Sequence, residues 1–135
     1  MIHDSAEVPR VPMQLTSGCL VASIQIDLND EVLFRFKRDL LEEIRLTQTR
    51  AVLLDVSGVD IMDRVEFEAI REIMRMSRLM GARSMLVGMK AEIACSLMDF
   101  DLDLRQIETA LTLDRAFQQL QPNGDNNGGR HESTR

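Results

Sequence analysis

The sequence predicts an α/β fold with a mainly parallel, mixed sheet of about five strands and about four helices. Continuous apolar runs such as Ala51–Leu54 are typical of strands that are buried on both faces of a parallel sheet. These runs alternate with segments whose apolar residues recur at helical spacing, and the clearest such stripe is Val32, Phe36, Leu40 and Ile44. Strands and amphipathic helices in alternation indicate a sheet with helices packed against it.

The boundaries follow from caps, turns and periodicity. Strands are expected at Met13–Thr16, Cys19–Ile26, Arg50–Val56, Ser84–Met89 and Ile107–Leu113. Helices are expected from a cap at Asn29-Asp30 to about Leu46, from Arg64 to Met80, from Ala91 to Phe100, and from Asp114, a candidate cap, to Leu120. Asp63, followed three residues later by Glu66, predicts a capping box that begins the second helix at Arg64. Gly81 is expected to end that helix.

We predict one domain over residues 13–120. Residues 1–12 contain two prolines, Pro9 and Pro12, and are expected to form an irregular lead-in. Residues 121–135 are rich in Asn, Asp and Gly and contain no aliphatic side chain, so we expect a disordered tail.

The composition excludes several classes of partner. The formal net charge of −6 disfavours nucleic acids and anionic membrane surfaces, which need a basic face. The chain has neither a signal-peptide pattern at its start nor an apolar run of membrane-spanning length. Cys19 and Cys95 are far apart in apolar surroundings, and we expect reduced thiols in a cytoplasmic protein.

No residue pattern predicts catalysis, a metal or a cofactor. Asp55, Asp60, Asp63 and Glu66 do not have the spacing of a calcium loop, and a strand end and a helix cap explain them. Gly81 and Gly88-Met89-Lys90 do not form the phosphate-loop pattern. The two histidines lie near the chain ends, and Ser57, Ser96 and Cys95 lack a base partner, so we predict a protein that is not an enzyme.

Two places suggest interaction surfaces. The loop Ser57–Asp63 leads into a helix start, whose free N–H groups favour an anion, although the residues alone favour an ordinary strand-to-helix corner. Met62 in this loop is a candidate partner contact. Phe34 and Leu41 are expected opposite the buried stripe of their helix, as an oligomer contact or as two scattered exposed residues.

Four segments in order carry a resemblance to a known family. They are Leu53–Asp63, which is similar to the family pattern ΦΦDΦSxVxΦΦD (Φ, apolar), Ser77–Arg83, Val87–Ala94 and Ile107–Leu111. Over residues 13–120 the chain resembles the STAS family of sulfate transporter and anti-sigma-factor antagonist domains, and most of all its RsbS-type members. The resemblance implies a STAS-like fold.

The resemblance also implies a function. RsbS-type proteins are non-enzymatic scaffolds and anti-sigma-factor antagonists, which bind a serine/threonine switch kinase (RsbT-like) and RsbR-like STAS proteins in the bacterial stressosome, so a homo- or hetero-oligomer is expected. The family's phosphoacceptor directly follows the Asp that matches Asp63, where this chain has Arg64. A second family hydroxyl matches Ser96. The alternative is a STAS-type small-ligand or nucleotide sensor that uses the loop Ser57–Asp63.

These considerations predict three sets of site residues. The partner-binding and switch residues are Ser57, Asp60, Ile61, Met62, Asp63, Arg64, Val65 and Glu68; the candidate phosphorylation sites are Ser96 and Ser57; the oligomer contact is Phe34 and Leu41.

Overall fold

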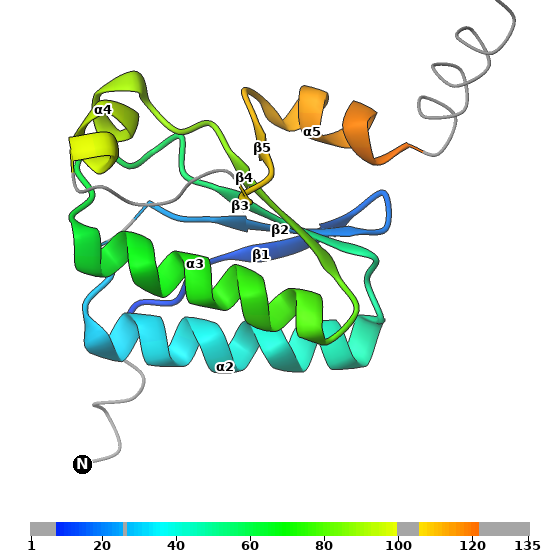
Figure 1. Cartoon of the computed structure of the whole chain (residues 1–135). Helices are drawn as coiled ribbons and strands as arrows, with labels where there is room; N and C mark the ends of the chain where they lie inside the picture. The colour runs from blue at the N-terminus through cyan, green and yellow to red at the C-terminus, as the bar shows by residue number, and fades with distance from the viewer. Residues whose placement is uncertain (1–7, 26, 100–105, 122–135) are drawn as a thin grey trace, which may run out of the picture.

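The computed structural model describes residues 8–25, 27–99 and 106–121. The described residues form a five-stranded sheet in which the strands follow their order in the sequence (Figure 1). The strands are β1 (Met13–Thr16), β2 (Cys19–Ser23), β3 (Ala51–Asp55), β4 (Arg83–Val87) and β5 (Thr109–Ala110), and the helices are α2 (Asp30–Thr47), α3 (Arg64–Leu79), α4 (Ala91–Asp99) and α5 (Leu113–Leu120). β1 and β2 are antiparallel and the other pairs are parallel, which confirms the predicted fold class.

Helices cover both faces of the sheet. α2 and α3 lie side by side on one face, and α5 lies on the other (Figure 1). Successive residues of a strand point to opposite faces, so Val52 and Leu54 join the core beneath α2 and α3, whereas Ala51 and Leu53 join the core beneath α5. Phe36 and Phe67 are the largest fully buried side chains.

The C-terminal end of α3 is fixed by a Schellman motif. Gly81 has a φ of +93°, a conformation that glycine adopts without a Cβ penalty. Its N–H donates to the carbonyl of Arg78, and the N–H of Ala82 donates to the carbonyl of Ser77, both at 3.0 Å. The prediction that Gly81 ends this helix is confirmed.

The largest differences from the predicted boundaries are at β2 and in the segment from β5 to α5. β2 ends at Ser23, although the N–H of Ile24 still donates to the carbonyl of Asp55 at 2.9 Å. β5 is only two residues long, because the next side chain, Leu111, is exposed and Thr112 already caps α5. The Thr112 hydroxyl accepts from the N–H of Arg115 at 3.2 Å, so the prediction of Asp114 as the cap was wrong.

The described part of the lead-in packs on the domain. Residues 8–12 form neither helix nor strand, as predicted, but Val11 is buried in the core beneath α2. Residues 1–7 and 122–135 lie outside the described residues, so the boundaries of the lead-in and the disordered tail stay predictions. Among the described helices, none combines the length and the apolar character needed to cross a membrane.

The two cysteines have different surroundings. Cys19 is buried, and burial raises the pKa of its thiol, an effect that the positive charge of Arg50 opposes in part. Cys95 is exposed, because α4 buries only Ile93 and Leu97. The prediction of apolar surroundings was therefore wrong for Cys95.

Candidate functional site

The candidate site lies at the carboxyl edge of the sheet, in the loop from β3 to α3. Asp55 ends β3, and its Oδ1 accepts a hydrogen bond from the N–H of Ser57 at 3.0 Å, which turns the chain. Gly88 packs against this turn with a φ of +78°, and a Cβ there would lie 2.9 Å from the Cβ of Ser57. The loop therefore rests on the end of the neighbouring strand β4.

The start of α3 is held by the predicted capping box. Asp63 Oδ1 accepts from the N–H of Glu66 at 2.8 Å, and Glu66 Oε1 accepts from the N–H of Asp63 at 3.0 Å. Met62 precedes the cap, and Phe67 lies four residues after it; both are buried in the same core, the arrangement of a hydrophobic staple. Met62 is only 4% exposed, so the prediction that it contacts a partner was wrong.

A second contact connects the loop to the β4–α4 connection. The Lys90 ammonium donates a hydrogen bond to Asp60 and forms an ion pair with it. This hydrogen bond, together with the positive charge, lowers the pKa of the Asp60 carboxyl below its ordinary value. Sequence reasoning missed Lys90 and Gly88, although both follow a parallel strand and the carboxyl ends of parallel strands meet at one edge.

An exposed apolar surface flanks the helix start. Ile61 is 84% exposed and Val65 is 72% exposed, and only four positions separate them in the chain. Arg64 is exposed as the first residue of α3, and among the described residues no carboxylate lies within ion-pairing distance of it. Glu68 pairs instead with Arg71 at 3.0 Å.

Beside this surface lies a hollow of about 260 Å³. Its lining comprises Gln25, Asp27, Leu28, Gly58, Val59, Asp60, Ile61, Met62 and Glu66. Three of these side chains are acids and none of the described lining residues is basic, so the hollow is unfavourable for a phosphate group. This disfavours a nucleotide as its ligand.

The acidic residues of the loop have structural roles. Asp55 caps the turn, Asp60 pairs with Lys90, and Asp63 and Glu66 form the capping box. Within the described ranges, no three potential metal-ligating side chains come together.

The other predicted residues are placed as follows. Ser57 and Ser96 are both exposed, in the loop and on α4 respectively. Phe34 is 62% exposed, but Leu41 is half-buried and packs against the core beneath α2 and α3. The two therefore do not form one outward pair, because Leu41 lies closer to the buried stripe of α2 than expected.

The comparison with protein families decides the assignment. The model of the STAS domain matches residues 10–116. The chain belongs to the STAS domain family. RsbS of Moorella thermoacetica, solved with a Ser-to-Glu substitution, is 30% identical over 82% of this chain and 93% of that chain, with a TM-score of 0.71. A chain of the stressosome, a signal integration and transduction hub, is 29% identical over 81% and 95% of the two chains, with a TM-score of 0.72.

These neighbours confirm the predicted resemblance to RsbS-type STAS proteins. The protein TM1081 of Thermotoga maritima, 20% identical over 82% of this chain and 93% of that chain, has a TM-score of 0.65 and supports the STAS fold alone. No curated protein matches the chain.

Proposed function

We propose that this STAS protein is a non-enzymatic scaffold and anti-sigma-factor antagonist. It binds a serine/threonine switch kinase of the RsbT type and RsbR-like STAS proteins, in a cytoplasmic assembly of the stressosome kind. The observation that carries the proposal is the similarity to RsbS along nearly the whole domain, combined with an exposed apolar surface at the start of α3.

The partner surface is centred on Ile61 and Val65. Both aliphatic side chains are exposed on either side of the helix cap, and exposed apolar surface that adds up to a patch marks interaction sites. Asp60 and Asp63 border them, and Arg64 adds one positive charge. This surface suits a partner with an apolar pocket whose rim is mainly basic.

Arg64 stands where the family has its phosphoacceptor, so this surface lacks the family's phosphorylation switch. A phosphate on a residue at this position would add about −1.5 to −2 charges beside Asp60 and Asp63 and would repel a docked partner. Arginine has no hydroxyl for a serine/threonine kinase, so partner binding here is insensitive to phosphorylation at position 64. Ser57 and Ser96 are exposed and remain the candidate acceptors.

A small-ligand sensor is the weaker alternative, because the hollow beside the loop is acidic. Calorimetric titration with ATP and GTP separates the two functions, since the scaffold proposal expects no heat of binding from the isolated chain.

The proposal is tested by affinity capture from the native cell with identification of the retained proteins. The wild-type chain should retain a switch kinase of the GHKL type and RsbR-like STAS proteins. Val65→Asp should lose the kinase, whereas Leu79→Asp, an equally exposed aliphatic position at the opposite end of α3, should retain it. Capture without any such kinase, or equal loss from both variants, would contradict the proposed surface.

A further inference from the structure

Two hollows of opposite charge flank the layer formed by α2 and α3. One, of about 380 Å³, lies between α2 and β1 and is lined by the acids Asp39, Glu42 and Glu43. The other, of about 250 Å³, lies between α3 and the segment before β5 and is lined by Arg71, Arg75 and Arg78. Because β1 and β5 are the two edge strands of the sheet, the hollows lie on opposite sides of the molecule.

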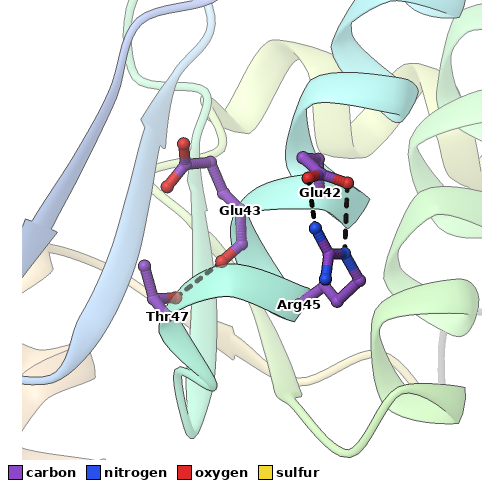
Figure 2. A network of polar contacts seen from close by, with 4 residues as sticks. All are labelled: Glu42, Glu43, Arg45 and Thr47. Carbon is purple, nitrogen blue, oxygen red and sulfur yellow. Dashed lines mark hydrogen bonds and ion pairs between the residues drawn. The ribbon is translucent and has the colours of Figure 1, made fainter.

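The acidic hollow keeps two carboxylates available. Arg45 holds Glu42 through an ion pair at 2.6 Å, whereas the carboxylate of Glu43 points away from Arg45, toward the side of the strands (Figure 2). Among the described residues, neither Asp39 nor Glu43 forms an ion pair. Arg10 also lines this hollow, which leaves a net negative charge.

The basic hollow keeps two guanidinium groups available. Arg71 pairs with Glu68 at 3.0 Å. Arg75 and Arg78 are exposed, and within the part of the chain that the structure describes neither has a carboxylate at ion-pairing distance. This basic group stands out on a chain with a net charge of −6.

The two charged groups have opposite signs and similar positions along their helices. α2 and α3 each follow a strand of the parallel part of the sheet, so both begin at its carboxyl edge and run in the same direction (Figure 1). Asp39 and Glu43 are about 6 Å apart along their helix axis, and Arg75 and Arg78 about 4.5 Å apart. Both pairs lie in the C-terminal half of their helices.

We propose that copies of this chain associate side by side, with the Arg75–Arg78 flank of one copy against the Asp39–Glu43 flank of the next. In this arrangement α2 of the neighbour lies beside α3 in the same direction as the molecule's own α2 does. Leu15, which is 53% exposed at the acidic hollow, and half-buried Ile107 at the basic hollow add apolar area to the contact.

This contact has definite physical properties. It joins two different surfaces, so it is heterologous and repeats from copy to copy into a ring or an open row. Exposed ion pairs are individually weak and are screened by salt, so the association is salt-sensitive. This contact, which rests on the co-assembly proposed above, uses a surface separate from the proposed kinase-binding loop.

Charge exchange between the two flanks tests the inference. Arg75→Glu/Arg78→Glu makes both flanks acidic, and Asp39→Lys/Glu43→Lys makes both flanks basic, so each variant alone should repel itself. In an equimolar mixture, every contact between the two different variants again joins an acidic flank to a basic flank. Sedimentation velocity of the full chain at about 50 mM salt, where screening is weak, reads the result.

We expect the wild type to associate, each variant alone to associate at least about tenfold more weakly, and the mixture to recover wild-type association. The control Glu92→Lys/Asp114→Lys, which changes the net charge by the same amount as Asp39→Lys/Glu43→Lys but at exposed sites on α4 and α5, should behave as the wild type. A monomeric wild type, or a mixture no better than its components, overturns the inference. Val65→Asp should leave this association unchanged, so a failure here is distinguishable from a failure of the kinase-binding proposal.

Discussion

Lys90, the residue before helix α4, forms an ion pair with Asp60 in the loop before helix α3. Beside it, Gly88 packs directly against Ser57 of the same loop. The loop that presents Ile61 is therefore attached at two points to the end of β4. A loop held in this way loses less backbone entropy on binding than a free loop would.

The pH response of Asp60 follows from this pair. The hydrogen bond and charge of Lys90 lower the pKa of Asp60, so Lys90→Met should raise that pKa toward its ordinary value. Because the folded pKa lies below the unfolded one, the contribution of the pair to stability is present above the unfolded pKa and is lost as pH falls through the folded pKa. Wild type and variant should therefore converge in stability in acid.

An NMR titration of the Asp60 carboxyl carbon measures this shift, with Lys90→Arg as the charge-preserving control. An identical titration in wild type and Lys90→Met would show that the ion pair does not form in solution.

The contact between Gly88 and Ser57 predicts a difference between two glycine substitutions. Gly81→Ala places a Cβ in open space at positive φ and should lower the free energy of unfolding by about 1 kcal/mol. Gly88→Ala has a similar backbone penalty and in addition brings its Cβ against Ser57, so its loss should be larger. Ser57→Gly should recover part of the Gly88→Ala loss and none of the Gly81→Ala loss. Urea denaturation of the two glycine variants, each alone and each combined with Ser57→Gly, measures these four free energies of unfolding. Equal losses at both glycines would refute the close packing.

The capping box makes Asp63 a stability residue. Asp63→Ala removes the acceptor for the Glu66 N–H and should lower the free energy of unfolding by about 1 kcal/mol. Asp63→Ser keeps an acceptor and should lose much less. Chemical denaturation followed by circular dichroism measures both, and a neutral Asp63→Ala would mean that α3 does not depend on this cap.

Phe34 and Leu41 should respond differently to the same substitution. Phe34→Glu changes an exposed side chain and should leave thermal stability nearly unchanged, while it weakens any association that uses this face of α2. Leu41→Glu places a charge where the side chain packs against the core and should destabilise the fold. Thermal unfolding and light scattering on both variants separate the effects. If both variants associate like the wild type, Phe34 is one of the scattered exposed residues.

Local patterns predicted the parts of the fold that local physics determines. The stripe Val32, Phe36, Leu40 and Ile44 is buried as its spacing indicated, and Asp63 with Glu66 forms the expected box. Thr112 was missed as a cap because Asp114, two residues later, is an equally good cap by type. Thr112 lies two residues after the end of the short strand β5, and this position makes Thr112 rather than Asp114 the cap of α5.

Long-range relationships were beyond the sequence. Lys90 and Asp60 are thirty residues apart, and only the neighbouring positions of β3 and β4 bring them together. Leu41 looked outward on a helical projection, but the projection does not include α3, which lies beside α2 and narrows its exposed face. The positions of the two charged flanks, on opposite sides of the molecule, likewise depend on the order of the strands in the sheet.

We propose that Arg64 makes partner binding constitutive, because the start of α3 then offers no hydroxyl to a serine/threonine kinase. The direct measurement incubates the chain with its switch kinase and ATP and follows intact mass and retained partner together. Wild type and Arg64→Ala should keep the partner and gain no phosphate at position 64, while Arg64→Ser should gain a phosphate there and release the partner. A wild-type chain that gains phosphate at Ser57 or Ser96 and then releases its partner would contradict the account.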